Sequence, residues 1–237
     1  MIREELKPQM RPKTTRFRCW GLPSVVACCA LMASGCGSAA DQTDSKPSAA
    51  KTPSTAEKPV GHSRLRSLLL APSDLGAGYT QAPAEDQGSE RYDDIGLSGC
   101  PALEKLGKQS DQMQFASKAA INFSYDTDST LGEELHSDAP STLSTKLRTL
   151  FRAYTACPSY EMTSGSTPIE VKITRSSLPR VGDEQFGYTT TLKFPHGSQV
   201  LKTVAVREKN VAVMLVGAPA LVDRNIDQAV GKVSSGS

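Results

Sequence analysis

Apolar side chains recur at helical spacing in several segments of the chain. The clearest segment is Ser141–Ala156, in which one helical face is apolar and the others carry Thr, Lys and Arg. The residues of that apolar face are Leu143, Leu147, Leu150, Phe151 and Tyr154. Shorter helices are predicted over residues 64–70, from Pro101 to about Lys108, and from Pro219 to about Val233.

Alternating apolar and polar positions predict strands over residues 119–125, 169–173, 186–194, 200–207 and 211–216. Short turn segments separate the last four, which favours antiparallel hairpins. Segment 211–216 is apolar on both faces, so we expect it at the centre of the sheet with cover on each side. The pattern as a whole predicts an α+β domain, in which an antiparallel sheet of about five strands packs with helices.

Residues 1–35 have the features of an export signal. Basic residues lead into an apolar stretch from about Trp20 to Ala33, which is shorter than the roughly 20 residues of a membrane span. The acids Glu4 and Glu5 are unusual ahead of such a stretch. Both Met1 and Met10 therefore stay open as the start, because a chain that begins at Met10 lacks these acids.

The segment Ala33-Ser34-Gly35-Cys36 resembles the lipobox of bacterial lipoproteins. In that motif diacylglycerol alkylates the thiol, and the chain is then cut to leave the cysteine as its first residue. Ala33 stands where the motif prefers Leu, and the alternative is an ordinary secretory signal with Cys36 as a free thiol. The resemblance implies lipidation of Cys36 and a membrane anchor on the outer face of the cytoplasmic membrane.

Between this cysteine and the first predicted helix, the chain is rich in Ser, Ala, Pro, Thr and Lys. A segment without apolar periodicity cannot offset the entropy cost of folding. Residues 36–63 are therefore predicted to form a lipidated, disordered tether, and residues 64–233 the folded domain.

The cysteines divide according to these segments. Of the six, Cys19, Cys28 and Cys29 fall in the signal and Cys36 is the lipid site, which leaves Cys100 and Cys157. In an oxidising compartment this pair is predicted to form a disulfide, which contributes about 4 kcal/mol by constraining the unfolded chain. Two reduced, buried cysteines would instead fit a cytosolic protein, which the signal argues against.

Export also changes the charge of the chain. The signal holds six of the 27 Lys and Arg and two of the 25 Asp and Glu, so the mature chain has 21 against 23, a formal charge of −2. No stripe of basic and aromatic residues is present. The sequence therefore predicts no nucleic-acid partner.

Catalytic and cofactor motifs are absent from the sequence, including H-E-x-x-H, the EF-hand loop, G-x-S-x-G and the P-loop. We therefore expect no enzyme activity, no cofactor and no metal. His136 is expected to be exposed in a polar loop.

Candidate ligand-binding residues are the acidic pair Asp183 and Glu184, with Tyr125 and Tyr188 as aromatic walls. The alternatives are that Asp183 caps a turn and that the tyrosines belong to the core.

Short motifs along the domain resemble one known family. The motifs are Leu69-Leu70-Ala71-Pro72-Ser73-Asp74-Leu75 leading to Gly78-Tyr79-Thr80, Cys100-Pro101 opening a helix, Cys157-Pro158 closing another, and Val181-Gly182-Asp183-Glu184 before a strand. Together they resemble the actinobacterial lipoproteins with a PknH-like extracellular sensor domain, over about residues 64–233. The resemblance implies an α+β domain with a central cleft that binds an unidentified ligand. This chain has one cysteine pair where the PknH type has two.

These observations favour a non-enzymatic, ligand-binding or sensor lipoprotein outside the membrane. A lipid or glycolipid carrier is an alternative, but it needs an apolar cavity that a domain so poor in Phe, Leu and Ile beyond its core hardly supplies. A protein-interaction module, which presents a sheet edge or helix face to a membrane complex, is a second alternative and needs no cavity.

Overall fold

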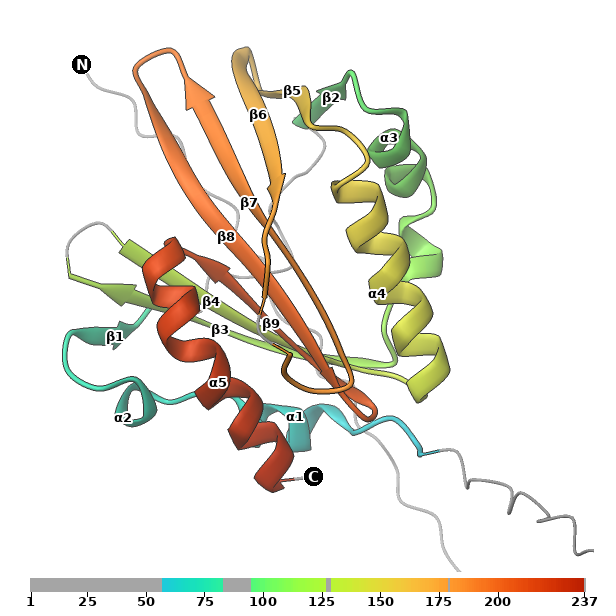
Figure 1. Ribbon diagram of the computed structural model, residues 1–237, viewed down its shortest axis with the longest axis vertical. Helices are drawn as coiled ribbons and strands as arrows, with labels where there is room; N and C mark the ends of the chain where they lie inside the picture. The colour runs from blue at the N-terminus through green and yellow to red at the C-terminus, as the bar shows by residue number, and fades with distance from the viewer. Residues whose placement is uncertain (1–56, 83–94, 127–128, 179, 237) are drawn as a thin grey trace, which may run out of the picture. The chain divides into compact units, whose positions relative to one another are not determined.

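An antiparallel sheet forms the centre of the structure, which is a computed structural model describing residues 57–82, 95–126, 129–178 and 180–236 (Figure 1). Within these residues the sheet has nine strands in the order β1-β3-β4-β9-β8-β7-β6-β5-β2. The strands are β1 (Tyr79–Gln81), β2 (Ile95–Ser98), β3 (Ser117–Tyr125), β4 (Ser129–Ser137), β5 (Ser159–Ser164), β6 (Thr167–Arg175), β7 (Glu184–Phe194), β8 (Gly197–Glu208) and β9 (Val211–Gly217). The predicted α+β class is correct, but the predicted count of about five strands is wrong.

The predicted strands correspond to β3, β6, β7, β8 and β9, whereas β1, β2, β4 and β5 were missed. Strands β1 and β2 have three and four residues, too few to show a period of two. Strand β5 buries Tyr160 but otherwise points mainly polar side chains to solvent. In strand β4, the charged residue Glu133 lies between the buried Leu131 and Leu135 on the inward face. The alternation of apolar and polar residues is therefore broken in the sequence.

The helices are α1 (His62–Leu68), α2 (Pro72–Leu75), α3 (Pro101–Lys108), α4 (Pro140–Tyr154) and α5 (Pro219–Gly236), with a 3₁₀ helix η2 (Ser110–Met113). Four of the five α-helices lie where apolar periodicity predicts them, within a few residues at each end. Proline occupies the start of α3 and α4, where its missing N–H breaks no helical hydrogen bond.

Helices cover opposite faces of the two halves of the sheet, so that two hydrophobic cores form. The α5-side core is built by α1, α5 and strands β3, β4, β8 and β9, and includes Leu65, Phe123, Leu131, Leu215 and Val222. The α4-side core is built by α3, α4 and strands β5 to β9, and includes Leu103, Leu147, Phe151, Val171 and Ala205. In Figure 1, α5 and α1 accordingly lie on the side of β3 and β4, and α3 and α4 lie across from them.

Strand β9 connects the two cores. Val211, Val213 and Leu215 point into the α5-side core, while Ala212 and Met214 contact the α4-side core. Its neighbours are β4 and β8, so it has paired strands on both edges. The central, doubly covered position predicted for residues 211–216 is confirmed.

The predicted disulfide is present at one end of the α3–α4 pair. It joins Cys100, directly before α3, to Cys157, shortly after α4, with their Cα atoms 5.8 Å apart. Closing a loop with a sequence separation of 57 residues limits the unfolded chain and contributes about 4 kcal/mol in the entropy model. The bond thus fixes the two helices that cover the α4-side core.

Residues ahead of α1 also contact the folded body. The backbone N–H of Val60 lies 2.8 Å from Ser137 Oγ, and Asn210 Nδ2 donates to Lys58 O at 2.6 Å. The folded body therefore begins before Arg64, within the segment that the sequence analysis assigned to the tether. The signal, Cys36 and the tether up to residue 56 lie outside the described residues.

A carboxyl group is buried in the α5-side core. Glu133 on β4 has no exposed surface, and its Oε2 accepts a 2.6 Å hydrogen bond from the backbone N–H of Leu70. Its Oε1 has no hydrogen-bond partner among the described residues. Burial raises the pKa of Glu133 from 4.5 to about 7, against the opposing effects of the Leu70 N–H and the nearby Lys232 charge.

Glu133 therefore makes the stability of the domain depend on pH. A raised folded-state pKa means that its contribution is complete below about pH 4.5 and is lost as pH rises toward 7. Replacing Glu133→Gln is expected to remove a decline of about 3 kcal/mol between pH 4.5 and 7.5. Urea unfolding of both proteins across this range measures the effect. Glu161→Gln, at an exposed position of β5, should leave the decline intact, and an equal decline in Glu133→Gln would contradict the assignment.

Candidate functional site

The acidic pair Asp183 and Glu184 lies where β7 begins, directly after Gly182. Gly182 has φ +67°, and an added Cβ would come within 2.6 Å of Arg207 O, so only glycine fits this close approach. The backbone N–H of Asp183 donates to the same Arg207 oxygen at 2.8 Å. The loop is thereby held against β8.

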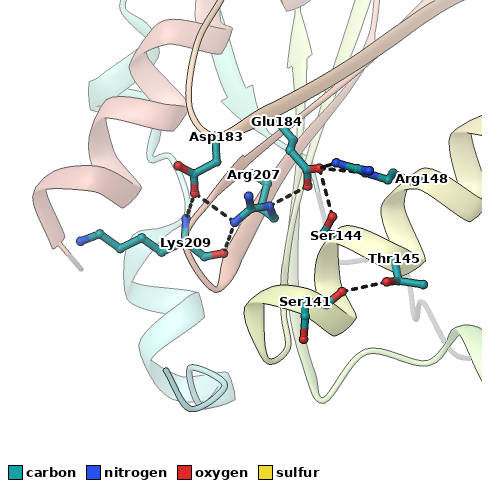
Figure 2. Close-up of polar contacts among 8 residues, drawn as sticks. All are labelled: Ser141, Ser144, Thr145, Arg148, Asp183, Glu184, Arg207 and Lys209. Carbon is teal, nitrogen blue, oxygen red and sulfur yellow. Dashed lines mark hydrogen bonds and ion pairs between the residues drawn. The ribbon is translucent and has the colours of Figure 1, made fainter. Parts of the chain in front are cut away.

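Glu184 connects β7, β8 and α4 through one carboxylate (Figure 2). Its Oε2 accepts from Arg207 Nε at 2.8 Å, and its Oε1 accepts from Ser144 Oγ at 3.0 Å and from Arg148 Nε at 2.8 Å. Burial alone would raise the pKa of Glu184. The hydrogen bonds from Arg207, Arg148 and Ser144, together with the Arg207 charge, outweigh burial and lower the pKa to about 2.

Asp183 binds the turn between β8 and β9 (Figure 2). Its Oδ2 accepts from the backbone N–H of Lys209 at 2.8 Å and from Arg207 Nη1 at 3.0 Å. Lys209 has φ +53°, so this contact holds a strained turn residue. Asp183 therefore makes the backbone contact that the turn-capping interpretation expects, and both carboxylates take part in a structural network.

The two candidate tyrosines lie in different cores. Tyr188 is buried in the α4-side core, with its ring 5.5 Å from Phe151 and 5.6 Å from Tyr154, and burial raises its pKa. Tyr125 packs 4.6 Å from Tyr79 beside the α5-side core. Neither tyrosine is among the hydrogen-bond partners that the described residues give Asp183 and Glu184, so the structure does not bring the four candidates together.

A hollow of about 610 Å³, here called the central hollow, lies on the sheet face beyond the cover of α4. Strand register places the side chains of Asn122, Glu134, Val216 and Leu201 on this face. The full lining is Ala82, Asn122, Phe123, Ser124, Thr130, Gly132, Glu134, Gln199, Leu201, Val216 and Gly217. The hollow thus offers hydroxyl, amide and carboxylate groups beside aliphatic carbon, from strands distant in sequence.

His136 borders this face and corrects the expectation of an exposed loop histidine. It lies in β4, is 6% exposed, and its Nε2 is 2.9 Å from Glu134 Oε2. The hydrogen bond with His136 is the main cause that lowers the pKa of Glu134. The other ring nitrogen, Nδ1, has no partner among the described residues.

Within the described ranges, no group of three or more His, Cys, Asp or Glu side chains is placed to hold a metal ion. No described helix is long and apolar enough to span a membrane.

Comparisons with known proteins identify the fold. No family model matches the chain, and no curated protein sequence matches it. Among solved structures, the fold is similar to the extracellular domain of PknH from Mycobacterium tuberculosis, with a TM-score of 0.58 and 12% sequence identity. The similarity covers 75% of this chain and 98% of that domain. The PknH-like fold that the sequence motifs implied is confirmed.

Sequence reasoning missed the residues of the central hollow and three arginines beside the acidic pair, Arg148, Arg152 and Arg175. Arg175 could have been noticed, because it continues the inward row of Ile169, Val171 and Ile173 on β6. The residues of the hollow could not be found in this way, because its lining depends on the pairing of β4 with β9, which are far apart in the sequence.

Removing the Glu184 charge should destabilise the domain above pH 4.5. Glu184→Gln leaves Arg207 and Arg148 without their shared carboxylate, which should cost about 2–3 kcal/mol at pH 7. A lowered folded-state pKa means that this contribution fades as pH falls from 4.5 through 2, so the gap between the two proteins should shrink to less than half at pH 3. Urea unfolding at both pH values measures the gap. Glu104→Gln, at an exposed position of α3, is the control, and a gap as large at pH 3 as at pH 7 would argue against the network.

Proposed function

We propose that this protein is a lipid-anchored, non-enzymatic lipoprotein on the outer face of the cytoplasmic membrane that senses the cell envelope by binding a ligand in its central hollow. The ligand is a small molecule or envelope component with both polar and apolar groups. The anchor is the lipid on Cys36, and residues 36–56 serve as the tether.

Location outside the membrane is supported by three observations. The pattern of residues 1–35 is typical of an export signal, and Cys36 follows it directly. The Cys100–Cys157 disulfide is typical of an oxidising compartment. The fold is similar to a domain described as extracellular, over 98% of that domain.

The central hollow is the observation that carries the binding role. A hollow of about 610 Å³ is within the range of small-molecule sites. Its floor is a rigid sheet, and its polar groups come from β3, β4 and β8. Such a site can orient a ligand through Asn122, Glu134 and Gln199 while Val216 and Leu201 cover its apolar part.

The anchor is tested by the intact mass of the full-length chain expressed in a bacterial host. The expected product begins at Cys36 and carries the mass of diacylglycerol with any further acyl chain. Cys36→Ser should lack this mass and retain the signal, because cleavage follows lipidation. The control Cys28→Ser/Cys29→Ser changes cysteines within the same signal and should leave the product unchanged. An unmodified product from the wild-type chain would exclude the anchor.

Binding in the hollow is tested by native mass spectrometry of the same processed protein, released gently from non-ionic detergent. We expect an adduct of defined mass that dissociates on denaturation. Ser124→Trp should abolish the adduct, because the indole fills the hollow from β3. Ser235→Trp, at an exposed position of α5, adds the same ring elsewhere and should retain it. An adduct that survives Ser124→Trp would place the ligand outside the hollow.

A protein-interaction module is the second candidate function, and one observation favours it. The large apolar side chains that are exposed among the described residues, Phe194 and Val200, both lie near the tip of the β7–β8 hairpin, at 37% and 44% exposure. Exposed apolar side chains at a hairpin tip can contact a membrane-protein partner. A protein mass without any adduct would favour this candidate over ligand binding.

A further inference from the structure

A second pocket, here called the arginine pocket, lies between α4, the end of β6 and the start of β7. It has a volume of about 280 Å³ and is lined by the side chains of Arg148, Arg152 and Arg175. Phe151 and Phe186 also line it, with their rings stacked at a centroid distance of 5.1 Å. The pocket therefore combines three guanidinium groups with an aromatic floor.

Two of the three arginines have no partner in the described structure. Arg148 is bound to Glu184, but that carboxylate is shared with Arg207. The side chains of Arg152 and Arg175 are exposed and make no hydrogen bond or ion pair with any described residue. The positive charge at the pocket therefore exceeds the negative charge that the described residues supply.

The positions of the three arginines on α4 and β6 explain why all three line the pocket. Arg148 and Arg152 are one helical turn apart on α4, and Thr155 extends the same stripe. Arg175 occupies the last position of the β6 row that faces α4, where Ile169, Val171 and Ile173 are buried in the core. Arg175 is exposed, so its guanidinium group lines the pocket while remaining open to solvent.

The number of donors indicates the chemistry of the ligand. A guanidinium group presents a planar fork of N–H donors that fits carboxylate and phosphate oxygens. A carboxylate has two oxygens, whereas a phosphate monoester has three that can each face a different arginine. Its charge of nearly −2 at pH 7 also matches two unpaired guanidinium groups.

We propose that the arginine pocket binds the phosphate monoester group of a ligand, with Arg152 and Arg175 as its direct donors. Arg148 adds a third donor while keeping its contact with Glu184. The aromatic floor of Phe151 and Phe186 contacts the carbon portion next to the phosphate. This site is separate from the central hollow, because the two share no lining residue.

Calorimetric titration of the full-length, host-processed protein in non-ionic detergent tests the proposal, with inorganic phosphate as the probe at constant ionic strength. The variant Arg152→Gln/Arg175→Gln is expected to raise the dissociation constant for phosphate by about tenfold or more. The matched control Arg66→Gln/Lys105→Gln removes two exposed cations on α1 and α3 and should change it by less than about twofold.

Two results would overturn the proposal. One is a wild-type protein that shows no binding heat with millimolar phosphate. The other is an equal weakening in the variant and the control, which would reflect overall charge and not the pocket. Circular dichroism of the variant checks its fold, and Arg152→Lys/Arg175→Lys, which keeps the charge but loses the fork, should show intermediate affinity.

The same titration distinguishes two sources of a phosphate monoester. Detergent micelles are mixed either with phosphatidic acid or with phosphatidylcholine. Loss of the phosphate signal only with phosphatidic acid would support a lipid headgroup as the ligand. An unchanged signal in both mixtures would support a soluble phosphorylated ligand. The two proposals can fail independently. Loss of the adduct in Ser124→Trp tests only the central hollow, whereas phosphate affinity in the Arg152 and Arg175 variants tests only the arginine pocket.

Discussion

The burial of β9 on both faces is the constraint on which the rest of the fold depends. A strand that is apolar at nearly every position must have cover above and below, and paired strands on each edge, to satisfy its backbone. Here β4 and β8 supply the pairing, while the two cores supply the cover. Because each group of helices covers a different half of the sheet, each half also keeps one face with less cover. The central hollow lies on such a face.

Buried or half-buried carboxylates join the elements that apolar contact alone does not hold. Glu184 ties α4 to the β7–β8 hairpin through two arginines and a serine. Asp74 accepts from Ala71 N at 2.7 Å and pairs with Lys232 of α5, whose ammonium also donates to Leu69 O. Glu133 holds the adjacent Leu70. The Leu-Leu-Ala-Pro-Ser-Asp motif is thus fixed by polar contacts from β4 and α5, which gives a physical role to a motif that the sequence analysis recognised only by resemblance.

The central hollow and the arginine pocket lie on the same face of the sheet, and only the pocket is lined by residues of α4. The hollow takes its character from strand side chains of mixed polarity, whereas the pocket takes its character from guanidinium groups over a stacked aromatic pair. The acidic network at Glu184 contributes to the pocket indirectly, because it holds Arg148 in place and leaves Arg152 and Arg175 unpaired. The two pockets thus differ in chemistry and share no lining residue.

The sequence by itself determined the features that depend on local pattern. The helices α3, α4 and α5, the strands β3 and β6 to β9, and the pairing of Cys100 with Cys157 follow from periodicity and from a count of the cysteines. Only the tertiary structure decided the edge strands β1 and β2 and the strand β5 next to β2, which are too short or too polar to show a period. It also placed Glu133 and His136 inside, against their polarity, and brought Arg175 to face α4. These features depend on contacts between residues far apart in the chain, where the free energy of pairing and burial outweighs the preference of each residue taken alone.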